Sequence, residues 1–125
     1  MKFLRVAVLV VGLGFLLPGF LAVFRTDRLA EFLSLDLVPP TGLVTVRVLI
    51  GAPYLAMAGV CIYTAIKSTW AWLVPIAATE GLMALLRISS GFVHGYSAAG
   101  IPEMLIETFI CVLMAYAARQ SAHAP

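Results

Sequence analysis

Long apolar runs alternate with short polar connections along this chain. The runs cover residues 3–24, 42–66, 69–89 and 102–118. A helix needs about 20 apolar residues to cross a hydrocarbon core that is roughly 30 Å thick. The pattern therefore predicts four transmembrane helices in one domain, residues 1–125. Because the connections are short, we expect an all-α, antiparallel four-helix bundle.

The connection between the first two runs has an amphipathic pattern of its own. Residues 25–37 mix acidic and basic side chains with apolar ones at near-helical spacing, namely Leu29, Phe32, Leu33 and Leu37. This pattern predicts a short helix that lies at the membrane surface. Pro39 and Pro40 follow it, and we expect them to end it because proline cannot continue a helix.

The stretch between the third and fourth runs is rich in residues that favour turns. Residues 90–101 include Gly91, Gly95 and Gly100, and we interpret them as a loop or re-entrant turn. Pro102 is predicted as the first residue of the fourth helix, where its missing N–H has no partner to lose.

The composition supports a lipid environment. Hydrophobic residues make up 62% of the chain and charged residues 11%, and the mean hydropathy is +1.05. A soluble domain has roughly a quarter of its residues charged, so this chain lacks the polar side chains that would cover its apolar surface in water.

Several classes of site have little support in the sequence. The net charge of +2 is spread thinly, with no basic run that would follow a nucleic-acid backbone. Cys61 and Cys111 are solitary in apolar runs, and we interpret them as structural. We therefore expect no metal, no cofactor and no nucleic-acid partner.

The basic residues suggest an orientation in the bilayer. With four crossings, one side carries Lys2, Arg5, Lys67 and Arg119. The other side has Arg25 and Arg28 in its loop. Since cytoplasmic loops are enriched in Lys and Arg, we expect both termini in the cytoplasm, in a bacterial inner membrane.

Ionisable residues inside the predicted spans are the candidate functional residues. Taking about 1.5 Å per residue, Arg47 and Glu107 lie roughly 8 Å into their spans, and Arg87 lies about 5 Å from the end of its own. Such charges face other helices or water, so we expect both arginines to pair with Glu107. Glu103 shares one helical face with Glu107, nearer the headgroups. His94 lies in the loop above them and is interpreted as an interface residue whose charge responds to mild acid.

Glu80 is the most deeply placed of these residues. It lies about 15 Å from either end of the third span, near the bilayer midplane. No cation is predicted at that depth, so we expect a neutral carboxyl group that is hydrogen-bonded to Thr79 or Tyr54, or that faces a water-filled pocket.

The order of several single residues resembles a known group of proteins. It runs from Pro18 through an acidic stretch to Arg47, and continues with Gly51, Gly59, Arg87, Gly91, Gly95 and Glu107. In this order the chain resembles small bacterial four-helix membrane proteins of unknown function that are distantly similar to DoxX-like proteins. It departs from them after Arg47, where Gly51 is followed by Ala52 and Pro53 rather than by a second glycine. The resemblance implies the fold but no defined activity.

Three functions are compatible with this pattern. We interpret the chain first as a non-catalytic accessory component that contacts lipid and either itself or a larger membrane complex, since no nucleophile or cofactor motif is visible. The alternative is a binder or transporter of a lipid-like small molecule that uses Glu80. The third is an intramembrane enzyme with Glu80 and Glu107 as acid and base, about 8 Å apart along the membrane normal.

Overall fold

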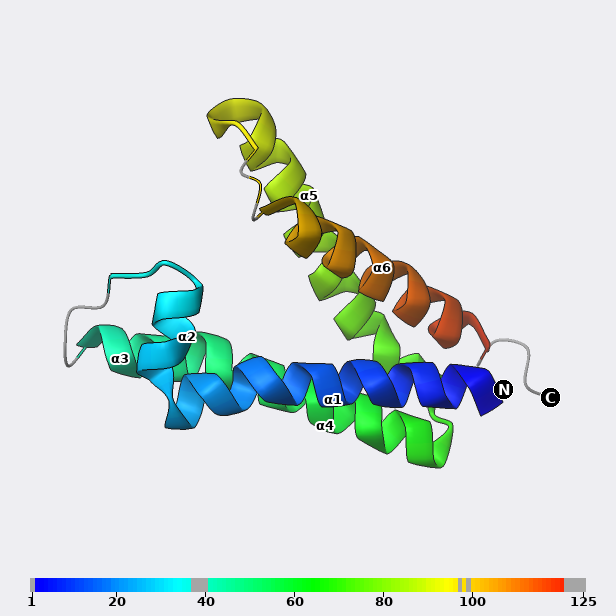
Figure 1. Ribbon diagram of the computed structural model, residues 1–125. Coiled ribbons are helices and arrows are strands. Elements are labelled where there is room, and N and C mark those ends of the chain that lie inside the picture. The colour runs from blue at the N-terminus through cyan, green and yellow to red at the C-terminus, as the bar shows by residue number, and fades with distance from the viewer. Residues whose placement is uncertain (1, 37–40, 97, 99, 121–125) are drawn as a thin grey trace. The chain divides into compact units, whose positions relative to one another are not determined.

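In the computed structural model the chain is helical, and residues 2–36, 41–96, 98 and 100–120 are described. The elements in chain order are α1 (Lys2–Phe24), α2 (Thr26–Phe32), α3 (Thr41–Val46), η1 (Arg47–Gly51), α4 (Ala52–Lys67), η2 (Trp70–Leu73), α5 (Val74–His94) and α6 (Gly100–Arg119) (Figure 1). Four continuous segments in the described part are long and apolar enough to cross a membrane, namely Lys2–Phe24, Thr41–Lys67, Trp70–His94 and Gly100–Arg119. The predicted all-α class and the four long apolar helices are confirmed.

The end of the third long helix differs from the prediction. Helix α5 runs past Ser89 to His94, so the expected loop at Ser90 is wrong for its first part. The helix ends at Gly95, whose φ of 87° lies in a region that glycine adopts without steric cost. Helix α6 then starts at Gly100, before Pro102.

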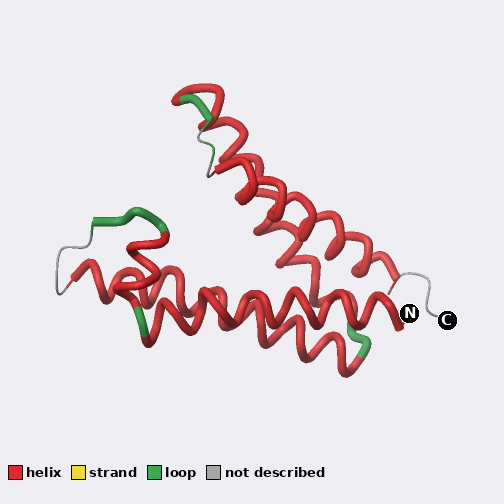
Figure 2. The backbone as a smooth tube through the Cα atoms, viewed as in Figure 1, coloured by secondary structure: helices red, strands yellow, loops and turns green. Residues whose placement is uncertain are grey.

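The contacts divide the chain into two compact units, residues 1–66 and 67–125, and each is described by itself. The predicted single bundle of four helices stays a prediction. The first unit is built on an antiparallel pair of helices, α1 and the continuous helix α3–η1–α4 (Figure 2). Their close contact depends on glycine. A Cβ on Gly12 would lie 2.8 Å from Cys61 Cβ, and one on Gly51 would lie 2.9 Å from Val23 Cγ2.

The second long helix contains a wide turn. Arg47–Gly51 form a π-helical turn, in which the backbone N–H of Ala52 bonds to the carbonyl oxygen of Arg47. Pro53 follows directly, and its ring would clash with a carbonyl one α-helical turn earlier. The wider turn moves that carbonyl away from the proline ring. This explains why the π-helical turn lies just before Pro53.

Helix α2 packs at one end of this helix pair. Ala22, Leu29 and Val46 form a small buried cluster there. The predicted short helix in residues 25–37 is confirmed, although it ends at Phe32, and its position at a membrane surface stays a prediction. Pro39 and Pro40 lie outside the described residues.

The second unit is a helical hairpin of η2, α5 and α6. Helices α5 and α6 run antiparallel, because Gly81 lies against Cys111 while Arg87 contacts Glu107. Trp70 in η2 is buried, whereas Trp72 is exposed.

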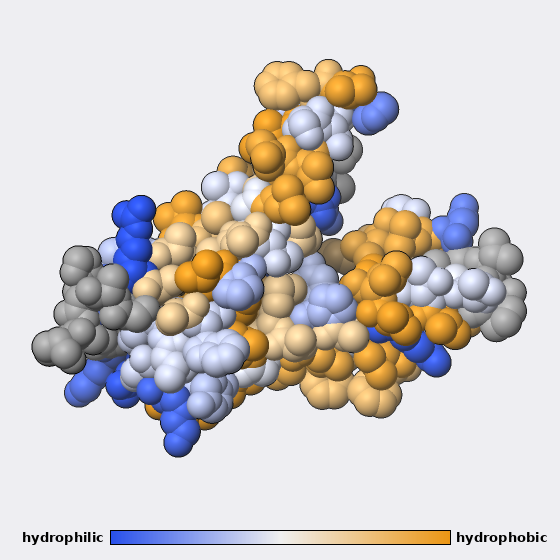
Figure 3. Space-filling model, turned by 180° about the vertical axis from the view of Figure 1, so that it is seen from behind, coloured by the Kyte–Doolittle hydropathy of each residue, from blue (hydrophilic) through white to orange (hydrophobic). Residues whose placement is uncertain are grey.

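Apolar side chains, drawn in orange, cover much of the visible surface of the helices (Figure 3). Large exposed apolar residues occur on every long helix, for example Leu13, Leu49, Leu86 and Phe109. Water-soluble monomers rarely have contiguous apolar surface of this extent. Such a surface is expected of helices that contact lipid.

Candidate functional site

One arginine of the second unit is held by two glutamates. Arg87 Nε donates to both carboxylate oxygens of Glu107, at 2.8 and 2.9 Å, and Arg87 Nη1 lies 2.7 Å from Glu103 Oε2. These distances are those of charge-assisted hydrogen bonds, which are stronger than neutral ones. The cluster holds one positive and two negative groups, so a net negative charge remains.

The spacing of the two glutamates on α6 explains this geometry. Glu103 and Glu107 are four residues apart and therefore share one helical face, as predicted. Glu103 lies in the first turn of α6, where the helix dipole favours a carboxylate. The Glu107 side chain is only 8% exposed, compared with 38% for Glu103. Glu107 thus depends more on Arg87 for its compensating charge.

A pocket lies beside this cluster at the closed end of the hairpin. Its cavity volume is about 170 Å³. The lining residues come from the end of α5, the connection and the start of α6: Arg87, Ser90, Gly91, His94, Gly95, Tyr96, Gly100 and Met104. Arg87 therefore belongs to both the ionic cluster and the pocket wall. The structure thus brings four predicted residues close together. His94 and Arg87 line the pocket, and Arg87 is paired with Glu103 and Glu107.

The wall of the pocket is shaped by Tyr96, which folds back onto α5. Its ring lies directly over Gly91, where a Cβ would collide with ring atoms. The Tyr96 hydroxyl donates to the carbonyl oxygen of Ile88 at 3.1 Å. The sequence pattern placed Gly91 in a loop or re-entrant turn, but it lies inside α5, where the missing side chain leaves space for an aromatic ring.

Glu80 is buried in α5, with 2% of its surface exposed. Its Oε1 atom has no hydrogen-bond partner among the described residues. Of the two predicted partners, Thr79 donates instead to the carbonyl oxygen of Pro75 at 2.9 Å, within its own helix. The other, Tyr54, belongs to the first unit, and that contact stays a prediction.

Arg47, the remaining candidate, has a partner that the charge pattern did not reveal. Its Nε donates to Thr26 Oγ1 at 3.0 Å. The predicted ion pair of Arg47 with Glu107 would join the two units and stays a prediction. Thr26 lies inside the charged stretch of residues 25–37, but a neutral hydroxyl does not stand out in a search for opposite charges.

Both oxygens of Glu107 accept from Arg87 Nε, which fixes the orientation of this carboxylate. Among the described residues, no group of three or more His, Cys, Asp or Glu side chains is suited to a metal ion. What the hairpin offers is a small pocket of mixed polar and apolar lining beside the ionic cluster.

The chain was also compared with known proteins. No protein-family model, no curated protein and no solved structure matches it. The resemblance to DoxX-like proteins therefore stays a prediction that rests on the residues named above.

Proposed function

We propose that this chain is a non-catalytic integral membrane protein whose α5–α6 hairpin binds the headgroup of a small amphiphilic molecule. The observation that carries the proposal is the pocket next to the cluster of Arg87, Glu103 and Glu107. Membrane insertion is supported by the four long apolar helices.

The size of the pocket favours a headgroup rather than a whole ligand. Binding sites for drug-sized molecules measure about 300–1,000 Å³, and this cavity is about 170 Å³. Exposed apolar residues adjoin its lining in the sequence, such as Phe92 and Ile101. A polar group in the cavity with an apolar tail along these side chains satisfies both surfaces.

The charge of the cluster selects the headgroup. Arg87, which lines the pocket, is already paired with two carboxylates, so it has little attraction left for a further anion. A neutral or cationic headgroup needs no such attraction, and it can accept or donate hydrogen bonds at Ser90 and His94. We therefore expect alkylamines to bind better than fatty acids of equal length.

Binding of dodecylamine and dodecanoate to the full chain, purified in a neutral detergent, tests this proposal. We expect dodecylamine to bind and the Ser90→Leu variant, which fills the pocket, to bind it at least about tenfold more weakly. Ser89→Leu is the matched control, because Ser89 is exposed on the same helix but does not line the pocket. Equal affinities of the two variants, or preference for dodecanoate, would reject the proposal.

Membrane insertion itself is tested separately. We expect the chain to stay with membranes during alkaline carbonate extraction, as proteins with transmembrane helices do. We further propose a bacterial inner membrane with both termini in the cytoplasm, supported by Lys2, Arg5, Lys67 and Arg119. Reporter fusions at each terminus check this orientation, and a periplasmic signal from either one would contradict it.

A second candidate function, an accessory component of a membrane complex, is favoured by helix α6. Only 17% of its apolar window is buried, compared with 28% for each of the other three long helices. A larger share of this helix is therefore free to contact a partner helix, from the same chain or another. Crosslinking in native membranes tests this candidate, and a purely monomeric pattern would argue against it.

A further inference from the structure

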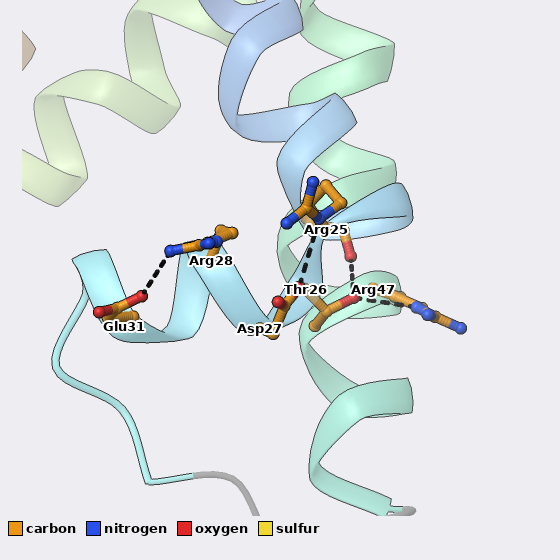
Figure 4. A network of polar contacts seen from close by, with 7 residues as sticks. Arg25, Thr26, Asp27, Arg28, Glu31 and Arg47 are labelled. Carbon is orange, nitrogen blue, oxygen red and sulfur yellow. Dashed lines mark hydrogen bonds and ion pairs between the residues drawn. The ribbon is translucent and has the colours of Figure 1, made fainter.

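The orientation of Arg47 is fixed by two hydrogen bonds in series. Arg47 Nε donates to Thr26 Oγ1 at 3.0 Å, and the same hydroxyl donates to the carbonyl oxygen of Ala22 at 2.7 Å (Figure 4). Thr26 is 3% exposed, so its hydroxyl is held in place by the surrounding helices. The guanidinium group is thereby held at its Nε edge, while its terminal nitrogens point away from α2 (Figure 4).

Arg47 differs from the neighbouring arginines in having a neutral partner. Arg25 lies 3.8 Å from an oxygen of Asp27, and Arg28 lies 3.5 Å from an oxygen of Glu31. No carboxylate of the described residues forms an ion pair with Arg47. No described carboxylate therefore compensates the positive charge of Arg47. The residue is exposed, so a molecule from outside the chain can reach it.

The position of Arg47 along its helix places this charge near a membrane surface. It lies six residues after Thr41, where α3 begins, which corresponds to about 9 Å along the helix axis. At that depth an arginine side chain reaches the headgroup region by extending toward it. The π-helical turn that starts at Arg47 is a further local departure from the regular helix, and such turns are frequent at functional sites.

We infer that Arg47, oriented by Thr26, binds the phosphate group of an anionic phospholipid. The inference rests on the proposed insertion of the helices into a membrane. A guanidinium group presents paired N–H donors whose geometry matches phosphate oxygens, and a lipid phosphate supplies the missing negative charge. Thr26 acts as the positioning residue, since it uses the Nε donor and leaves the terminal nitrogens for the lipid.

Lipid retention in nanodiscs tests this inference on the full chain. The protein is reconstituted with equal amounts of phosphatidylglycerol and phosphatidylcholine, released into detergent, and examined by native mass spectrometry for the lipids that remain bound. We expect wild-type protein to retain phosphatidylglycerol preferentially. We expect Arg47→Gln to reduce this retention about fivefold, the effect of one basic residue near an anionic surface.

Two further variants separate a specific site from general charge. Arg28→Gln is the matched control, because it removes an arginine from the same unit that is already paired with Glu31, and its retention should equal that of wild type. Thr26→Val keeps every charge but removes the hydroxyl that orients Arg47. We expect this variant to retain less phosphatidylglycerol than wild type, but still to prefer it to phosphatidylcholine. This variant also keeps the inference testable should Arg47→Gln fail to fold.

Several outcomes would overturn the inference. Equal retention of phosphatidylglycerol by wild type, Arg47→Gln and Thr26→Val would do so, as would equal retention of the two lipids by wild type. Displacement of the bound lipid by millimolar inorganic phosphate would assign the site to a free anion instead. Extraction of the chain by alkaline carbonate would show that membrane insertion had failed, which is distinguishable from an inserted protein that ignores headgroup charge.

Discussion

Arg87 Nε lies 2.8 Å from Glu107 Oε1 and 2.9 Å from Glu107 Oε2, so one N–H is shared between both oxygens of a nearly buried carboxylate. The second glutamate of the cluster, Glu103, is held by a different nitrogen and is much more exposed. The two carboxylates thus share a cation but differ in how much they rely on it, and this difference can be measured.

We expect Glu107→Gln to destabilise the protein more than Glu103→Gln. The buried glutamate loses a charge-assisted bond that water cannot replace, whereas the exposed one is partly solvated and screened. The difference should be about 1 kcal/mol, given the modest energies of polar contacts between membrane helices. Reversible unfolding in mixed micelles, followed by circular dichroism, measures it, and equal or reversed effects would contradict the geometry.

A double-mutant cycle isolates the contact itself. Combining Arg87→Gln with Glu107→Gln should cost less than the sum of the single variants, because the second substitution removes a group that the first left unpaired. We expect a coupling free energy of about 1 kcal/mol. Additive effects would mean that the two side chains do not interact in the folded protein.

Helix packing in the first unit predicts opposite effects of alanine at two glycines of α1. A Cβ on Gly12 would lie 2.8 Å from Cys61 Cβ, which cannot move without its backbone, whereas a Cβ on Gly14 would meet nothing within 4 Å. Gly12→Ala should therefore cost about 1–3 kcal/mol of overpacking. Gly14→Ala should be neutral or stabilising by up to about 1 kcal/mol, because alanine favours a helix. The same unfolding assay checks both, and similar values would show that α1 and α4 do not pack closely.

The connection after α5 predicts a conformational effect at Gly91. Alanine there would collide with the Tyr96 ring, so Gly91→Ala should release that ring and open the connection. We expect faster amide hydrogen exchange around Gly95 and weaker dodecylamine binding. Tyr96→Phe keeps the ring but loses its bond to Ile88, and should have a smaller effect, about 1 kcal/mol. Unchanged exchange in Gly91→Ala would contradict the close contact.

The helices were predictable from the sequence because apolar runs of about 20 residues are typical of transmembrane helices. The predicted span 3–24 matches α1, and 42–66 matches the helix Thr41–Lys67, almost to the residue. The third span was predicted too short at its C-terminal end. In the extension to His94, the ring of Tyr96 packs over Gly91 from beyond the end of the helix. No local sequence pattern reveals such a contact.

The candidate site was predicted in its charges but not in its neutral members. Helical spacing correctly placed Glu103 and Glu107 on one face, and opposite charge correctly predicted Arg87 as the partner of Glu107. The hydroxyl of Thr26 and the wide turn at Arg47 escaped notice. Hydroxyl partners and helix geometry depend on how two helices meet, and Pro53 was the one local sign of the wide turn.

Glu80 offers the sharpest separation of stability from function. Its Oε1 atom is buried without a hydrogen-bond partner among the described residues, and such an atom costs about 1–3 kcal/mol. We therefore expect Glu80→Leu, in which leucine is apolar and of similar volume, to keep or raise stability. We expect Glu80→Gln to keep stability close to wild type.

Infrared spectroscopy checks the sequence-based hypothesis that Glu80 is a neutral carboxyl group. We expect a carboxylic acid band in wild-type protein that is lost in Glu80→Gln. Loss of stability by more than about 1 kcal/mol in Glu80→Leu would mean that the carboxyl group has a strong partner and is structural. If Glu80→Leu keeps its stability but impairs growth or ligand binding, the carboxyl group of Glu80 has a functional role instead.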